Sequence, residues 1–200
     1  MQDFTDKVAV ITGGASGVGR SLAFALGRRG AKIVVGDVDR KALTVVAADL
    51  AAEGIEAIAE FCDVTSVDSL NAVADRAVAE FGGLHLVFAN AGIGAGESGN
   101  MWDYSDKDWQ WTLNVNLWGV INSIKVFMPR LIEQGVESHF AITGSGNGAL
   151  IVLPDCPVYT ATKAAVQSIT ENLHFQVTAQ QLPVKISALF PGPYVVDTGF

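Results

Sequence analysis

The chain has 200 residues, of which 50% are apolar, and its formal net charge at pH 7 is -8. A chain of this length and composition can build one domain with a sizeable core. The acidic balance, without a cluster of Lys or Arg, excludes a basic face for a nucleic-acid backbone or an anionic membrane, so we expect a small-molecule partner.

The amino-terminal residues 1–7 carry two acids and no apolar stretch, so they do not resemble a secretory signal. No apolar run along the chain is long enough to span a membrane, and we expect a cytoplasmic protein. Two cysteines occur, Cys62 and Cys156, without the spacing of a disulfide framework or a zinc site. We therefore expect two reduced thiols and no metal.

Short β-branched runs alternate with longer amphipathic segments from end to end. The runs predict strands over residues 7–12, 32–37, 56–62, 84–89, 138–143 and 184–190, and the segments predict helices over 17–29, 40–53, 67–81, 106–133 and 158–179. This alternation is typical of βαβ units with right-handed crossovers. We predict an α/β fold, a single Rossmann-type domain over residues 1–200 with a doubly wound, mainly parallel sheet and ligands at the carboxyl ends of its strands.

A glycine-rich turn joins the first predicted strand to the first predicted helix. Glycines let the chain turn sharply and bring backbone N–H groups against a pyrophosphate, and the helix amino terminus adds a favourable dipole. Tight turns also use glycine for steric reasons alone, but the strand–turn–helix context favours a dinucleotide site. The predicted cofactor contacts in this turn are Gly13, Ser16, Gly17, Val18 and Gly19.

The second predicted strand ends in Asp37, where an acid would accept hydrogen bonds from the adenosine ribose hydroxyls. The same carboxylate would repel a 2'-phosphate, so we expect NAD(H) rather than NADP(H). Arg40 is the only nearby charge that could soften this preference. The alternative is that Asp37 is an ordinary residue at the end of a strand.

Tyr159 and Lys163 lie four residues apart on the last predicted helix and share one of its faces. A free tyrosine titrates near pH 10, so a shift to neutrality requires about 4 kcal/mol of preferential stabilisation of the phenolate, which a nearby cation can contribute. Such pairs are also common on solvated helix surfaces, so the spacing alone does not assign a function.

The motifs of this chain occur together in one order: Thr12-Gly-x3-Gly-x-Gly, Asp63-Val64, Asn90-Ala91-Gly92, Asn116, Ser145, Tyr159-x3-Lys163 and Pro191-Gly192. With them the whole chain resembles the short-chain dehydrogenase/reductase family. The resemblance implies that Tyr159 is the general acid/base, that Lys163 holds the nicotinamide ribose and lowers the pKa of Tyr159, and that Ser145 orients the substrate oxygen. Asn116 would position a water that relays protons through Lys163. The remaining implied cofactor contacts are Asp63, Val64, Asn90, Ala91, Gly92, Pro191 and Gly192.

The resemblance implies an NAD(H)-dependent oxidoreductase that interconverts a secondary alcohol and a ketone, in a homotetramer or homodimer. The apolar residues Ile151, Val152 and Leu153 suggest an apolar substrate. A catalytically silent dinucleotide-binding sensor or assembly subunit is the alternative from another class, and an NADP(H)-dependent ketoacyl-type reductase is the alternative within enzymes. Asn114 competes with Asn116, but two residues apart on a helix they point to different faces, and the surrounding pattern favours Asn116.

Two departures from the family pattern concern Ser145 and the end of the chain. Gly146 stands where the family serine usually lies, so either the loop before Tyr159 carries one extra residue or the serine role is vacant. We expect the Ser145 hydroxyl within hydrogen-bond reach of Tyr159 or of a shared substrate oxygen, with Asn147 as the alternative donor. The chain ends at Phe200, where family members continue through a substrate loop, a helix and a final strand, so we expect those parts to be missing.

Overall fold

Six parallel strands form a single sheet in a computed structural model of the protein, which describes residues 1–94 and 100–192. Its spatial order is β3-β2-β1-β4-β5-β6, and every neighbouring pair is parallel. The strands are β1 (Val8–Thr12), β2 (Lys32–Asp37), β3 (Ala57–Phe61), β4 (Leu86–Ala89), β5 (Ser138–Thr143) and β6 (Val184–Leu189). This arrangement confirms the predicted α/β doubly wound fold, and the strand order reverses between β1 and β4, where such sheets bind ligands.

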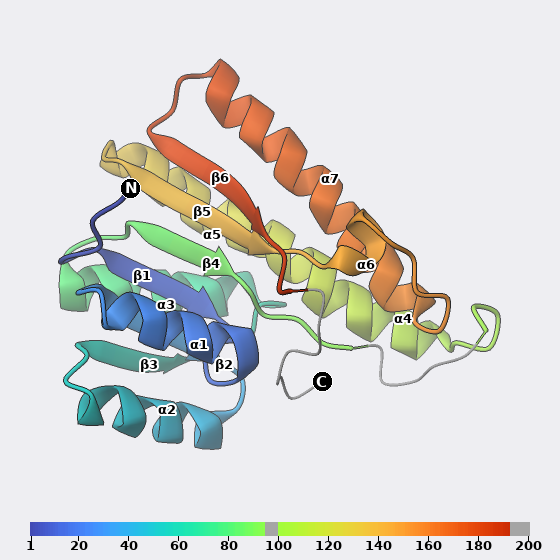
Figure 1. The fold of residues 1–200 in the computed structure, drawn as a ribbon, viewed down its shortest axis with the longest axis horizontal. Helices are drawn as coiled ribbons and strands as arrows, with labels where there is room; N and C mark the ends of the chain where they lie inside the picture. Colours follow the sequence, from blue (N-terminus) through green and yellow to red (C-terminus); the bar gives the residue numbers. More distant parts are fainter. Residues whose placement is uncertain (95–99, 193–200) are drawn as a thin grey trace.

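Helices cover both faces of the sheet because successive strand residues point to opposite sides. Val8 and Val10 of β1 belong to the core cluster shared with α3 (Val67–Phe81), α5 (Gly119–Gln134) and α7 (Pro157–Ala179). Ala9 and Ile11 belong to the other cluster, with α1 (Gly17–Gly27) and α2 (Arg40–Ala52). All strand arrowheads in Figure 1 point to the side where the short α6 (Gly146–Ala149) and the start of α7 lie.

The long helix predicted over residues 106–133 is divided by a π-helical turn. It consists of α4 (Asp106–Leu113), the turn η1 (Asn114–Trp118) and α5, and the N–H of Gly119 donates to the carbonyl oxygen of Asn114 across the turn. A π-turn accommodates one extra residue and leaves the apolar periodicity almost unchanged, so the sequence pattern does not reveal it. Such turns often occur at functional sites, and this one contains the buried Asn116.

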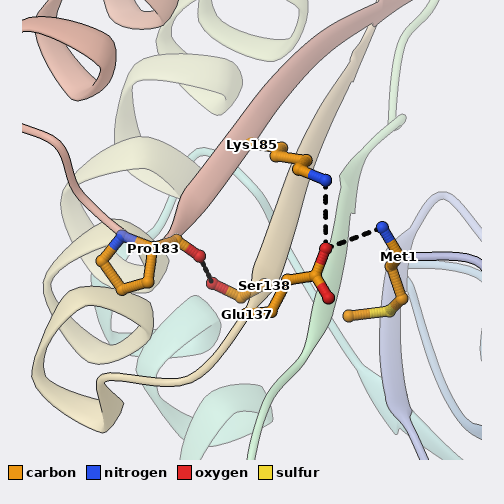
Figure 2. Close-up of polar contacts among 5 residues, drawn as sticks. All are labelled: Met1, Glu137, Ser138, Pro183 and Lys185. Atoms are coloured by element: carbon orange, nitrogen blue, oxygen red, sulfur yellow. Dashed lines mark hydrogen bonds and ion pairs between the residues drawn. The ribbon is translucent and has the colours of Figure 1, made fainter.

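The edge of the sheet at the amino ends of β5 and β6 is held by an ion cluster, shown in Figure 2. The amino-terminal ammonium of Met1 and the ammonium of Lys185 lie 2.8 Å and 3.0 Å from the same carboxylate oxygen of Glu137. Hydrogen bonds from these two ammonium groups lower the pKa of Glu137 to about 2, and the bond from Met1 has the larger effect. The cluster is at the edge opposite the strand ends that carry the candidate site.

No helix among the described residues has both the length and the apolar character to cross a membrane.

Candidate active site

The glycine-rich turn after β1 is closely packed and leads directly into α1. Gly13 has a φ of +62°, and a Cβ there would lie 2.8 Å from the Cα of Ala91. A Cβ on Gly19 would overlap the carbonyl oxygen of Gly13. Glycine is therefore required at both positions. Ser16 is exposed and precedes Gly17, where α1 begins, so the turn presents its backbone at a helix amino terminus, which favours an anion.

Asp37 faces this turn from the end of β2. One of its carboxylate oxygens accepts a 3.1 Å hydrogen bond from the backbone N–H of Ala15, and the other accepts one of 3.1 Å from the backbone N–H of Asp39. Each carboxylate oxygen can accept a further hydrogen bond, so the group can still bind a ribose diol. The guanidinium of Arg40 is 4.3 Å from the centre of the Phe61 ring.

Asp63 and Val64 follow β3 and differ in what they offer a ligand. The Asp63 carboxylate accepts hydrogen bonds from the backbone N–H and the hydroxyl of Thr65, at 2.9 Å and 2.7 Å. The Val64 side chain is buried, and a Cβ on Gly119 would lie 2.6 Å from it. The Val64 carbonyl oxygen accepts a hydrogen bond from Asn122. A cofactor contact at Val64 would therefore have to use its backbone.

Asn90 links the glycine turn to the end of β5, across the position between β1 and β4 where the strand order reverses. Its side-chain amide donates to the carbonyl oxygens of Thr12 and Gly13, at 3.0 Å and 3.2 Å. Its amide oxygen accepts a 3.0 Å hydrogen bond from the Thr143 hydroxyl at the end of β5. The Thr12 hydroxyl accepts from the backbone N–H groups of Asn90 and Ala91. The structure thus brings the predicted Gly13, Asn90 and Ala91 together through two threonines.

Thr12 and Thr143 were not among the predicted site residues. Thr12 is the first residue of the glycine motif, and both threonines are the last residues of buried strands, β1 and β5. A polar residue at the end of a buried parallel strand indicates that the residue lies at the carboxyl edge of the sheet, where ligands bind. Its hydrogen-bond partners, however, come from segments more than fifty positions away in the chain, as the pairing of Asn90 with Thr143 shows.

Asn116 is fully buried, and its amide is occupied by the chain that follows β4. Its oxygen accepts a 2.8 Å hydrogen bond from the backbone N–H of Ile93, and its nitrogen donates to the Ile93 carbonyl oxygen at 2.8 Å and to the Thr162 hydroxyl at 3.3 Å. A Cβ on Gly92 would lie 3.3 Å from the Asn116 oxygen. Asn114 is exposed. The Asn116 side chain therefore holds this segment in place, and its geometry gives no separate support to the expected water-positioning role.

Lys163 is buried beside Tyr159 at the carboxyl end of β5. Its ammonium donates a 2.9 Å hydrogen bond to the carbonyl oxygen of Thr143 and lies 5.7 Å from the centre of the Tyr159 ring. The residue is 4% exposed, and burial lowers the pKa of Lys163 to about 8. The predicted placement of both side chains on one helix face is thus observed, with the lysine in the deeper position.

Ser145 lies close to the Tyr159 phenol. The Ser145 hydroxyl also accepts a 3.2 Å hydrogen bond from the backbone N–H of Asn147. Burial raises the pKa of Tyr159, and the Ser145 hydrogen bond opposes that effect. The expectation that Lys163 lowers the pKa of Tyr159 is therefore corrected: desolvation of the phenolate is the larger effect, and the pKa lies above its ordinary value.

The chain as a whole matches a known family. A family model described as short chain dehydrogenase matches residues 7–199. The chain belongs to the short-chain dehydrogenase/reductase family. This short-chain dehydrogenase is 38% identical over 192 residues to SadH of Mycobacterium tuberculosis (strain ATCC 25618 / H37Rv), an alignment that covers 96% of this chain and 68% of SadH.

Two solved structures place this short-chain dehydrogenase among proteins of the same fold. A short chain dehydrogenase/reductase from Burkholderia phymatum, solved in complex with NAD, is 39% identical, with a TM-score of 0.91 over 96% of this chain and 67% of that one. The apo form of LigO from Sphingobium sp. strain SYK-6 is 32% identical, with a TM-score of 0.90 over 96% of this chain and 70% of that one. The chain thus spans about two thirds of the length of these proteins.

The remaining predicted contacts of the short-chain dehydrogenase lie after β6. Pro191 is half-buried and Gly192 is exposed, just beyond the pairing of the Gly144 N–H with the Leu189 carbonyl oxygen. Residues 95–99 and 193–200, Thr198 among them, lie outside the described residues. Within the described ranges, no group of three His, Cys, Asp or Glu side chains could hold a metal ion.

Proposed function

We propose that this short-chain dehydrogenase uses NAD(H) to interconvert a secondary alcohol and a ketone, with Tyr159 as the general acid/base. The observation that carries the proposal is the position of the Tyr159 ring, whose centre lies 5.7 Å from the buried ammonium of Lys163 at the sheet's carboxyl edge, while Ser145 acts on the pKa of the same phenol. These three groups can hold a substrate oxygen, exchange a proton with it and keep a positive charge close by.

The residues of the turn fit a dinucleotide. Gly13 and Gly19 have no side chains, so the backbone of the turn can approach a pyrophosphate closely. The amino terminus of α1 favours the negative charge of the pyrophosphate. Asp37 can bind the adenosine ribose hydroxyls, and its negative charge disfavours a 2'-phosphate, which supports NAD(H) over NADP(H). The Burkholderia phymatum structure contains NAD, which supports the same choice. When bound, the nicotinamide would supply or accept the hydride.

In the proposed mechanism the Ser145 hydroxyl donates a hydrogen bond to the substrate oxygen, and the Tyr159 phenol gives or takes the proton on that oxygen. Lys163, with a pKa of about 8, remains largely protonated at pH 7, and it keeps a positive charge beside Tyr159 and the proposed nicotinamide site. Thr143 and Asn90 keep this charge in a fixed place relative to the glycine turn. We also propose Asn116 as the support of the chain at Gly92, between the two halves of the site.

The substrate we propose is apolar, because the loop that joins Ser145 to Tyr159 exposes four consecutive apolar side chains. Leu150 is 80% exposed and Val152 is 74% exposed, with Ile151 and Leu153 between 45% and 60%. Apolar surface of this kind near a polar site is typical of pockets that bind an apolar substrate through a few polar groups. We propose a homodimer or homotetramer on the family resemblance alone.

A screen of secondary alcohols with NAD tests the function directly. We expect NADH absorbance to appear with at least one apolar alcohol, and Tyr159→Phe to abolish it while NAD still binds. A catalytically silent dinucleotide-binding protein would instead bind NAD and show no turnover with any alcohol or ketone. The Ser145–Tyr159 contact favours the enzyme, because a sensor has no need of a hydroxyl pair beside the nicotinamide. Turnover with NADP alone would favour a ketoacyl-type reductase.

A further inference from the structure

The loop between Ser145 and Tyr159 is fastened by the side chain of Asn147, which is 6% exposed. Its amide oxygen accepts 3.0 Å hydrogen bonds from the backbone N–H of Leu153 and from the hydroxyl of Thr160. Its amide nitrogen donates to the Cys156 thiol at 3.1 Å. A buried amide with partners on both ends is held in a single orientation. We call these four residues, Asn147, Leu153, Cys156 and Thr160, the Asn147 clasp.

The Asn147 clasp lies between two groups of the candidate site. On one side, the backbone N–H of Asn147 donates to the Ser145 hydroxyl at 3.2 Å. On the other side, Cys156 immediately precedes α7, and Thr160 follows Tyr159 in its first turns. One residue therefore contacts the serine through its backbone and the helix that carries the tyrosine through its side chain.

The rest of the loop supplies little packing of its own. Leu150 and Val152 are 80% and 74% exposed, so this stretch buries little apolar surface. The turn itself is pressed onto α7: Gly148 has a φ of +92°, and a Cβ there would lie 2.6 Å from the Thr160 carbonyl oxygen and 2.8 Å from the Ala164 nitrogen. The polar contacts of the Asn147 clasp and this close approach join the turn after Ser145 to α7.

We propose that Asn147 is a positioning residue that keeps the Ser145 hydroxyl in register with the Tyr159 phenol. This inference rests on the proposed function for its effect on turnover, but the geometry it describes exists without substrate. Because the Ser145 oxygen accepts a hydrogen bond from the Asn147 backbone, its own proton is directed elsewhere, toward Tyr159 or a substrate oxygen. A hydroxyl that accepts one hydrogen bond is also a stronger donor of another. The clasp also explains how the loop holds its shape although Ser145 stands one position before the usual family serine.

The test uses Asn147→Leu, which keeps the side-chain volume and removes both polar ends of the amide. We expect kcat to fall about tenfold, equivalent to about 1.4 kcal/mol, while the NAD dissociation constant and the KM for NAD stay unchanged. Asn172→Leu is the matched control, since Asn172 lies on the exposed face of α7 and its amide donates to the Ser168 carbonyl oxygen of the same helix. We expect parental kinetics for this control.

The deciding measurement is the titration of the Tyr159 phenol by ultraviolet absorbance, with Tyr159→Phe as the blank. The Ser145 hydrogen bond lowers the pKa of Tyr159 against the effect of burial, so loosening Ser145 in Asn147→Leu is expected to raise that pKa. The titration needs no turnover, so it tests Asn147 even if no alcohol proves to be a substrate. Should Asn147→Leu fail to fold, Thr160→Val removes one arm of the clasp and is expected to raise the same pKa. A folded variant with the parental Tyr159 titration would overturn the proposal, whatever its kcat.

Discussion

The ammonium of Lys163 donates a 2.9 Å hydrogen bond to the carbonyl oxygen of Thr143, the last residue of β5. The hydroxyl of the same threonine donates to Asn90, whose amide holds the glycine turn at Gly13. Two side chains therefore connect the turn proposed to bind the cofactor with the charge proposed to assist Tyr159. The position of that charge is set by the end of the sheet, because Lys163 is buried and has little contact with water.

Burial of Lys163 predicts a distinctive pH dependence of stability. The pKa of Lys163 is lowered to about 8 in the folded protein, whereas a lysine in an unfolded chain titrates near 10.4. Between these values the unfolded chain binds more protons, so burial of this lysine destabilises the fold fully below about pH 8, and stability recovers as pH rises toward 10.4.

Lys163→Met removes this titration and retains an unbranched chain. Relative to Lys163→Met, we expect the parent to gain about 3 kcal/mol in free energy of unfolding between pH 7 and pH 10.5, because the pKa of Lys163 is about 8 in the folded protein and near 10.4 in the unfolded chain. Guanidinium unfolding of both proteins at the two pH values measures the difference, in which other titrating groups largely cancel. A difference independent of pH would show that Lys163 is not held in a desolvated position.

Tyr159→Phe is expected to remove most turnover and leave NAD binding nearly intact. The substitution keeps the ring that packs near Lys163 and removes only the hydroxyl that hydrogen-bonds with Ser145. General acid/base groups contribute about 10²- to 10⁴-fold to rate, so a loss within that range is expected. Steady-state kinetics with NAD and a fluorescence titration of NADH binding measure the two effects separately. Parental kcat in this variant would exclude Tyr159 as the acid/base.

The fold was predictable because alternating strand and helix periodicities determine a doubly wound sheet almost on their own. The strand predicted over 138–143 matches β5 at both ends, since a buried parallel strand reads as an apolar run closed by a polar residue. The π-turn around Asn116 was not predictable in this way, because one extra residue in a helical turn changes the periodicity too little.

The sequence allowed the reactive residues of the candidate site to be predicted, but not the residues that hold them in place. Tyr159 and Lys163 follow from their spacing together with the other motifs, and Asp37 from its place after a strand. The hydrogen bond between Thr143 and Asn90 joins distant segments of the chain, and the partners of Asn147 depend on how one loop folds back onto α7. Neither can be inferred from a local sequence pattern. The direction of the Tyr159 pKa shift could not be predicted from the sequence either, because it depends on how deeply the folded chain buries the phenol, and burial outweighs the opposing effect of Ser145.

Asp37→Ala is expected to narrow the preference for NAD(H) over NADP(H). The variant removes both the acceptor proposed for the ribose hydroxyls and the repulsion of a 2'-phosphate, so kcat/KM should fall with NAD and rise with NADP. Asp39→Ala is an imperfect comparison, because Asp39 caps α2. Asp49→Ala, which removes an ion pair between α2 and Arg20 of α1, serves as the control. Equal kcat/KM for both cofactors in the parent protein would show that Asp37 does not set the preference.

Ser145→Ala is expected to reduce kcat by roughly a hundredfold or more, by comparison with removal of one oxyanion donor. The reason is geometric: the Ser145 hydroxyl is oriented by the Asn147 backbone N–H and lies close to the phenol, so it is placed to meet a substrate oxygen that Tyr159 also contacts. The Asn147 amide cannot replace it, because both of its ends are committed to the loop and to Thr160. Ser168→Ala, on the exposed face of α7, controls for loss of a hydroxyl and should leave kcat unchanged. A Ser145→Ala loss below about fivefold would mean that another donor holds the substrate oxygen, and that the serine role in this enzyme is vacant.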